Sequence, residues 1–379
     1  VALWWHYYPF RTEQIDPATV AAGAAFVGFL TGVSGLMFQP SALGPSVGVA
    51  VCIVGSLMLG VGAVISLRHI DSGDEVDEAE SPTRSTVGRA ACAFAYTLLL
   101  ALAVLVIWPA SPGDLSARGE PSTSYDDAVA LFESTTADEP GRVFEPCASQ
   151  LMTHGEKVEV AVVLFHGLTN CPKQFVEFGT RLHDGGANVL ILRAPGHGVA
   201  NEAGDAIGGL SNVAGLSAER LRDYADTSID IGVGLGDDVR VLGLSMGGVI
   251  ATWVAQERPD VQRVVAAAPA MTIPTVPAFL TDVLRNVGSK LPNIDLPGRA
   301  NLDHAYSGET TKGLTATFVM ADFVANSAYD AAPAVQDVIV VLNPDDDQVD
   351  PTHLAAFTER WADHDGTVSL HRLAGIGLP

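Results

Sequence analysis

The chain has 379 residues, of which 48% are hydrophobic and 17% charged, and its 44 acidic residues outnumber its 21 lysines and arginines. The net charge of −23 excludes an ordinary nucleic-acid-binding protein, because a phosphate backbone would be repelled. Four cysteines are too few for a disulfide scaffold, and the apolar fraction is too high for an intrinsically disordered chain.

Long uncharged runs fill the N-terminal part of the chain. No charged residue occurs between Asp16 and Arg68, which leaves room for two membrane-spanning helices of about 20 residues each. A turn with prolines and glycines separates them. Buried helices of a soluble protein are the alternative, but these runs offer no polar face. We therefore expect a membrane domain over residues 1–110. Its three spans are expected at about residues 18–38, 46–67 and 90–108.

Arginines beside the spans indicate their orientation. Arg11 precedes the first span and three arginines lie in the loop 68–89, whereas the loop between the first two spans has none. By the positive-inside rule, the N-terminus and the loop 68–89 are cytoplasmic. The sequence therefore predicts an integral protein of the cell membrane whose C-terminal domain is extracellular. The lipid bilayer is one expected partner, and a membrane-protein partner or a homo-oligomer is left open.

The region after the spans is strongly acidic. Residues 111–379 contain 36 acidic and 17 basic residues, a net charge of −19. This balance is typical of halophilic proteins adapted to high salt, and an ordinary acidic secreted domain is the alternative. Residues 111–150 are expected to form a stalk or linker with one helix, for which Ser124 is the predicted N-cap.

From Lys157 onward, apolar strands alternate with helices, which is typical of a parallel sheet covered on both faces. The expected fold class is therefore α/β, with a doubly wound, mostly parallel sheet in a domain over residues 151–379. We expect strands at 158–165, 188–192, 239–244, 261–267, 338–342 and 368–373. We expect helices at 125–134, 173–183, 217–231, 246–258 and 352–363.

A G-x-S-x-G motif places Ser245 between Gly243 and Gly247, directly after a predicted strand and at the start of a predicted helix. In that context the serine is a nucleophile on a tight turn. Two further motifs agree, because the strand 158–165 runs into His166-Gly167 and the run 193–198 (R-A-P-G-H-G) follows the next strand. The expected oxyanion hole consists of the N–H groups of Leu168 and Met246.

These three ordered motifs resemble the α/β-hydrolase superfamily, in particular its esterase, monoacylglycerol-lipase and lysophospholipase-like branch, over about residues 157–379. The resemblance implies a cap, here at about 271–334, which its prolines would break into short helical pieces. It also implies catalysis without a metal or cofactor, by a Ser, Asp and His in that order. Aligning the family's D-x-x-V-x-P setting selects Asp346, with Asp345 or Asp347 as register alternatives. A cation site made by the clustered acids is the rival interpretation, but their spacing does not fit an EF-hand loop.

The resemblance places the catalytic histidine after the last strand, where this sequence stops. We expect that histidine just beyond Pro379, in a chain that is truncated there. His371 is the fallback, although it lies within the predicted strand 368–373, and an inactive site is the third alternative. His166 and His197 lie in the family's loop motifs and are expected to shape those loops.

Cys147 and Cys171 flank the first strong strand of the domain. If the domain lies outside the cell, a disulfide between them is allowed. Two free buried thiols are the alternative.

The sequence as a whole predicts a membrane-anchored serine hydrolase that cleaves carboxylic esters through an acyl-enzyme. A tether beside a bilayer favours lipid or lysolipid esters. The alternative from another class is a catalytically inactive hydrolase-like subunit or binding module of a membrane assembly. Acyl transfer to an alcohol other than water uses the same residues and is left open.

Overall fold

The chain divides between Trp108 and Pro109 into two units, and the described residues belong to the second. The three predicted spans and the segment after Leu373 lie outside the described residues. Among the helices in the described part of the chain, none is both long and apolar enough to cross a membrane. The computed structural model describes residues 113–139, 141–272, 278–298, 302, 304–346, 348–364 and 368–373.

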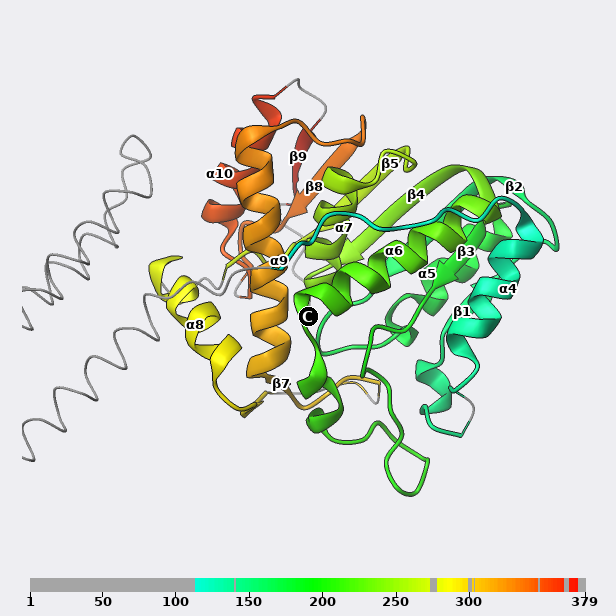
Figure 1. Ribbon diagram of the computed structural model, residues 1–379, viewed down its shortest axis with the longest axis horizontal. Helices are drawn as coiled ribbons and strands as arrows, with labels where there is room; N and C mark the ends of the chain where they lie inside the picture. The colour runs from blue at the N-terminus through cyan, green and yellow to red at the C-terminus, as the bar shows by residue number, and fades with distance from the viewer. Residues whose placement is uncertain are drawn as a thin grey trace, which may run out of the picture. The chain divides into compact units, whose positions relative to one another are not determined.

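A seven-stranded sheet forms the centre of the domain (Figure 1). Its strand order is β1-β3-β2-β4-β5-β8-β9, and all neighbours are parallel except β1, which pairs antiparallel with β3. The predicted mostly parallel sheet is therefore confirmed. The strands are β1 (Gln150–Met152), β2 (Val158–Phe165), β3 (Asn188–Ile191), β4 (Gly236–Leu244), β5 (Arg263–Ala267), β8 (Val338–Leu342) and β9 (Val368–Arg372).

Helices cover both faces of this sheet, and the alternation along β2 assigns them. Val163 and Phe165 belong to the large core that the helices α6, α7, α9 and α10 share. Val162 and Leu164 point to the opposite face, where they pack in a smaller core with α5. Successive side chains of a strand point to opposite faces, so this division is expected of a doubly wound sheet. The helices are α5 (Lys173–Asp184), α6 (Ala218–Leu235), α7 (Met246–Glu257), α9 (Thr311–Asp330) and α10 (Pro351–Ala362).

The predicted elements agree closely with the observed ones. The bounds of β2 and β8 are as predicted, and α4 (Tyr125–Thr136) has Ser124 as its N-cap, whose side chain accepts the N–H of Asp127. The prediction missed β1, which has only three residues. So short a strand carries too little of the alternating pattern to be recognised.

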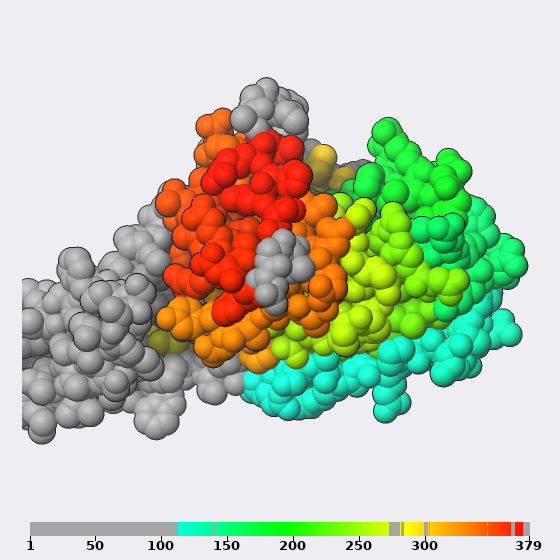
Figure 2. All heavy atoms as spheres, turned by 90° about the horizontal axis from the view of Figure 1, so that it is seen from above, coloured from blue at the N-terminus to red at the C-terminus, as the bar shows by residue number. Residues whose placement is uncertain are grey.

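The segment expected as a stalk is part of the domain, so that expectation is wrong for residues 113–123, which we call the strap. Leu115 is fully buried, and its carbonyl accepts the indole N–H of Trp253 at 2.8 Å. Figure 2 shows the start of the described chain, in cyan, lying along the domain rather than projecting from it. Further along, α4 packs on α6, and β1 belongs to the sheet.

Buried charged side chains of the domain bind the backbone of the strap. The backbone N–H of Arg118 donates to Asp226, and that of Glu120 donates to Asp230, each at 2.8 Å. Both carboxylates are buried and also pair with the guanidinium of Arg258 at 2.8 and 2.7 Å. These partners lie more than a hundred residues away in the chain, so no local pattern could announce the contact.

The cap insertion (residues 271–334) joins β5 to β8. It contains α8 (Ala278–Lys290), the short antiparallel pair β6 (Asp295–Pro297) and β7 (Gly308–Thr310), and α9. The expectation of short helical pieces is wrong for α9, which has 20 residues. The prolines at 274, 277, 292 and 297 all precede this helix and so do not interrupt it. The side chain of Thr310 caps its start by accepting the N–H of Gly313.

Candidate active site

The chain makes a strained turn at Ser245, where β4 ends and α7 begins. Ser245 has φ 59° and ψ −113°, a conformation that side chains other than glycine rarely adopt. Backbone hydrogen bonds hold it there. Its N–H donates to the carbonyl of Ala267 at 3.0 Å, and its carbonyl accepts the N–H of Val249 at 3.0 Å and that of Ala270 at 3.2 Å. The half-buried serine therefore stands at the carboxyl edge of the sheet.

Both glycines of the motif are required by the backbone itself. A Cβ on Gly243 would overlap the carbonyl oxygen of Gly247, and a Cβ on Gly247 would overlap the carbonyl oxygen of Phe165. The turn thus brings β4, α7 and the end of β2 into direct contact. This is the strand–turn–helix context in which a G-x-S-x-G serine acts as a nucleophile.

The segment after β2, residues 166–171, lies against this turn, and we call it the oxyanion loop. An ideal Cβ on Gly167 would lie 3.7 Å from the Cβ of Ser245, which is ordinary contact distance. The N–H of Met246 is the first of α7 and has no partner within the helix. The N–H of Leu168 donates to no other described residue. The two groups predicted to bind an oxyanion are thus beside Ser245, from two different elements.

Two buried histidines hold the oxyanion loop by its carbonyl groups. Nδ1 of His166 lies 2.9 Å from the carbonyl of Gly167, and its Nε2 accepts the N–H of Ala194 at 3.1 Å, so the proton is on Nδ1. Nε2 of His197 lies 2.8 Å from the carbonyl of Leu168. Burial lowers the pKa of His166 to about 3 and the pKa of His197 to about 4. Both rings are therefore neutral near pH 7 and occupied with the loop.

A disulfide ties the same loop to the segment before β1. Cys147 and Cys171 are both fully buried and are joined through their sulfurs. Gly198 packs against this bridge with φ +66°, and a Cβ on it would lie 2.7 Å from the Cβ of Cys147. The disulfide thus joins the oxyanion loop to a segment on which the second His-Gly loop also packs.

Among the acids after β8, Asp346 is held in a way that leaves one oxygen available. Its Oδ1 accepts the N–H groups of Gln348 at 2.8 Å and Val349 at 2.9 Å, whereas no other described residue donates to Oδ2. Asp345 is exposed, and Asp350 caps α10. Asp347 lies outside the described residues. Since β8 is two strands from β4 in the sheet, Asp346 stands at the same edge as Ser245.

His371 lies in the edge strand β9, where it pairs with Val341 of β8 and its side chain is exposed. Three strand spacings separate β9 from β4, or about 14 Å. His371 is therefore not brought to Ser245 in this structure. Residues 374–379 lie outside the described residues.

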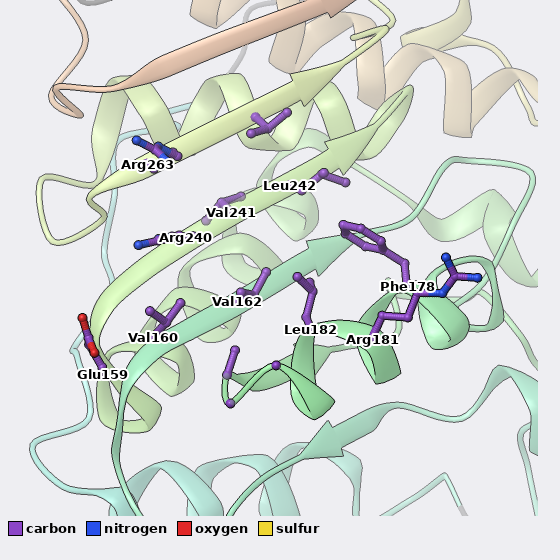
Figure 3. Close-up of a pocket in the computed structure, with 14 residues that line it drawn as sticks. Glu159, Val160, Val162, Phe178, Arg181, Leu182, Arg240, Val241, Leu242 and Arg263 are labelled. Atoms are coloured by element: carbon purple, nitrogen blue, oxygen red, sulfur yellow. The ribbon is translucent and has the colours of Figure 1, made fainter. Parts of the chain in front are cut away.

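A cavity of about 430 Å³ lies elsewhere, over the sheet face beside α5 (Figure 3). Val160, Val162 and Leu242 form its floor, and Arg240 and Arg263 stand at its rim. These two arginines pair with Asp238 and Asp337, so their charges are already compensated. None of its lining residues belongs to the serine turn, the oxyanion loop or the acids after β8.

Within the described ranges, no group of three or more His, Cys, Asp or Glu side chains is arranged to hold a metal ion.

The sequence did not predict two residues of the cap insertion that touch the oxyanion loop. The N–H of Tyr306 donates to the carbonyl of Thr169 at 2.8 Å, and Gly313 packs on the side chain of Leu168. Neither position lies in a motif, so no signal in the sequence could have found them.

Comparison with known proteins agrees with this geometry. Residues 156–341 match the profile of the Hydrolase_4 family, described as serine aminopeptidase, S33. A thermostable monoacylglycerol lipase from Bacillus sp. (strain H-257) is 27% identical over 153 residues, which are 38% of this chain and 56% of the lipase. The chain thus spans about half the length of this relative. The family match, the sheet order and the serine turn together support placing the domain in the α/β-hydrolase superfamily.

Solved structures of lipolytic enzymes are also similar. The monoacylglycerol lipase of Paleococcus ferrophilus aligns over 59% of this chain and 87% of its own, with 18% identity and a TM-score of 0.47. A structure from the metagenome-derived lipolytic enzymes LipS and LipT covers 61% of this chain and 89% of its own, with 18% identity and a TM-score of 0.46.

Proposed function

We propose that this domain is a serine hydrolase that cleaves carboxylic esters. The observation that carries the proposal is the backbone of Ser245, whose positive φ is enforced by two glycines that tolerate no side chain. Strain of this kind costs of the order of 1–3 kcal/mol and persists where the surrounding structure enforces it, often at reactive groups. The turn also presents the serine beside two unused backbone donors, which is the arrangement that acyl transfer needs.

The reaction follows from these positions. The Ser245 hydroxyl oxygen attacks the ester carbonyl carbon while a histidine takes its proton, and the N–H groups of Leu168 and Met246 bind the oxyanion. The C–O bond to the alcohol then breaks, and the histidine returns the proton to the leaving alcohol. A water molecule then attacks the carbonyl carbon of the acyl-enzyme while the histidine takes its proton. The bond to the serine oxygen breaks, the carboxylic acid leaves, and the histidine returns the proton to the serine. Asp346 orients this histidine, a role that His371 does not fill because its strand lies three strand spacings from β4.

A lipid-derived ester is the substrate class that the surface of the cap insertion supports best. Eight large apolar side chains are exposed in the described residues, and five of them fall between positions 284 and 302. Leu284 lies on α8, and Leu291 directly follows the end of that helix. The five are Leu284, Leu291, Ile294, Leu296 and Leu302.

Charge distinguishes the same surface from the rest of the domain. Residues 278–312 contain four acidic and four basic residues, a net charge of zero, whereas the remainder of 111–379 has 32 acidic and 13 basic residues, or −19. An anionic lipid surface would be repelled by most of the domain and tolerated at this insertion. The match to a monoacylglycerol lipase supports the same class of substrate.

The location we propose is extracellular, with the predicted N-terminal spans as the anchor. The buried disulfide supports this side of the membrane, since disulfides persist in oxidising compartments and are rare in the cytosol.

The test is the reaction of the purified full chain with a fluorophosphonate, in which the serine oxygen displaces fluoride from phosphorus. We expect an adduct that is present in the wild type and in the control Ser134→Ala, an exposed serine on α4, and is absent in Ser245→Ala. Turnover of a monoacylglycerol and of a water-soluble short-chain ester then separates lipid from simple esters. A folded wild type that forms no adduct would favour the catalytically inactive, subunit-like alternative.

A further inference from the structure

Three successive carbonyl groups of the oxyanion loop are all held by donors. The carbonyl of Gly167 accepts Nδ1–H of His166, and the carbonyl of Leu168 lies 2.8 Å from Nε2 of His197. The carbonyl of Thr169 accepts the backbone N–H of Tyr306 at 2.8 Å. Since a peptide unit is planar and trans, fixing these carbonyls also fixes the directions of the N–H groups between them. The direction of Leu168 N–H is therefore set by this row of bonds.

The third donor differs from the first two in its origin. His166 and His197 follow β2 and β3 and belong to the sheet domain, whereas Tyr306 lies in the cap insertion between β6 and β7. The insertion therefore makes a main-chain hydrogen bond to the loop that is predicted to bind the oxyanion.

Tyr306 also holds the neighbouring loop that supports Leu168. Its hydroxyl oxygen accepts the N–H of Gly198 at 2.8 Å, and its ring meets the ring of His197 edge-on, with centroids 6.0 Å apart. The side chain is 5% exposed, and burial raises the pKa of Tyr306 to about 12, so the hydroxyl stays neutral. One residue thus contacts both Thr169 and the His197–Gly198 pair.

A second contact from the insertion reaches the side chain of Leu168. Gly313, in the first turn of α9, faces Leu168 so closely that an added Cβ would lie 2.8 Å from Cδ1 of the leucine and 2.9 Å from Oγ1 of Thr310. The buried side chain of Leu168 thus packs against the start of α9, while its carbonyl is held by His197.

We propose that Tyr306 is a positioning residue through which the cap insertion holds the oxyanion loop in the conformation that aims Leu168 N–H at the substrate oxygen. This inference rests on the proposed hydrolase function. The Tyr306 hydroxyl fixes Gly198, His197 next to it fixes the Leu168 carbonyl, and the Tyr306 N–H fixes the Thr169 carbonyl. Displacing the insertion therefore turns the donor away from the oxyanion without touching Ser245.

The test compares three variants of the full chain: Tyr306→Phe, Gly313→Ala and the matched control Tyr329→Phe. Tyr329 is an exposed tyrosine on α9 whose ring lies under the guanidinium of Arg360. The measurements are kcat and KM for a short-chain ester, the rate of fluorophosphonate labelling and Tm. Because deleting an oxyanion donor outright lowers kcat about 100- to 1,000-fold, we expect misdirecting one in Tyr306→Phe to lower kcat about 10-fold. We expect KM to stay within about twofold, since the ester is bound mainly by other contacts.

The control is expected to keep the kcat of the wild type. Overturning results are a folded Tyr306→Phe with kcat within about twofold of the wild type, or a loss of rate that only follows the loss of folded protein. If Tyr306→Phe does not fold, Gly313→Ala decides, because its methyl group presses on Leu168 from the other side. A folded Gly313→Ala with unchanged kcat then overturns the proposal. A wild type that is not labelled at all instead refutes the hydrolase function itself.

Discussion

The oxyanion loop and the strap are both irregular segments bound to the same sheet domain, but the side chains that bind them differ in charge: neutral histidines for the loop and buried carboxylates for the strap. The loop is held by its carbonyls, which accept hydrogen bonds from neutral buried histidines and a backbone N–H. In the strap, N–H groups donate to the buried carboxylates of Asp226 and Asp230, and the carbonyl of Leu115 accepts the indole N–H of Trp253. Buried backbone groups must find partners, so an unpaired N–H needs an acceptor such as a carboxylate and an unpaired carbonyl needs a donor.

The difference has electrostatic consequences. Burial lowers the pKa of His166 and His197, so the loop is held by groups that remain neutral. Burial raises the pKa of Asp230, but its hydrogen bonds and ion pair with Arg258 favour the charged form. We therefore expect protonation of the two histidines to weaken the attachment of the oxyanion loop. Removal of the Arg258 guanidinium is expected to weaken the attachment of the strap.

The largest expected effect comes from removing that cation. Arg258→Ala leaves Asp226 and Asp230 buried without a positive partner, which we expect to lower the free energy of unfolding by about 3–5 kcal/mol. Urea unfolding of the full chain, followed by tryptophan fluorescence, measures this change.

The matched control is Arg118→Ala, because the ion pair of Arg118 with Asp114 is exposed and the substitution keeps the backbone N–H that Asp226 accepts. We expect this control to stay within about 0.5 kcal/mol of the wild type. Equal effects of the two substitutions would show that the buried charges do not hold the strap.

The next effect concerns the disulfide, which binds the oxyanion loop and involves no residue of the strap. Replacing Cys147 and Cys171 together by alanine opens a link across 24 positions and should lower the free energy of unfolding by about 3 kcal/mol. We also expect slower fluorophosphonate labelling of Ser245 than in Arg258→Ala protein that is still folded. Labelling at the wild-type rate would mean that the bridge stabilises the fold without shaping the oxyanion loop.

A smaller effect distinguishes the two regions by pH. The buried histidines have pKa values of about 3 and about 4, below the ordinary 6.5, so the unfolded chain takes up protons first as the pH falls. Stability is therefore lost on acidification between about pH 6 and pH 4, by about 1.4 kcal/mol per pH unit for each histidine. His166→Gln should remove one such contribution and flatten the pH dependence of unfolding. Parallel curves for variant and wild type would contradict this assignment.

The smallest effect is the response to salt. Buried ion pairs are screened little, so the stability difference between Arg258→Ala and the wild type should change by less than about 0.5 kcal/mol between about 0.1 and 2 M KCl. The wild type itself should become more stable over that range, because its net charge of −23 repels itself at low salt. A stability that is independent of salt would argue against adaptation to high salt.

Much of the candidate site was open to prediction because it is local in the sequence. The G-x-S-x-G motif, the strand before it and the helix after it lie within about twenty residues, and each glycine is required by a backbone contact with its neighbours. The same holds for the His-Gly motif after β2. Asp346 could be selected from its register against Val349, whose N–H it accepts in the structure.

The parts that were not predictable depend on partners far apart in the chain. Tyr306 reaches Gly198 across more than a hundred positions, and the strap reaches Asp226 and Asp230 across similar distances. A single isolated hydrogen bond leaves no periodic trace, so neither contact can be recognised before the chain is folded.

The sequence by itself predicted the alternation of strands and helices and the strand–turn–helix context of Ser245, because hydrophobic period and turn chemistry act over a few residues. Only the tertiary structure decided that the supposed stalk includes a strap packed on the domain, that Cys147 pairs with Cys171, and that the cap insertion touches the oxyanion loop. These three depend on which distant backbone groups and thiols meet once the two faces of the sheet are covered.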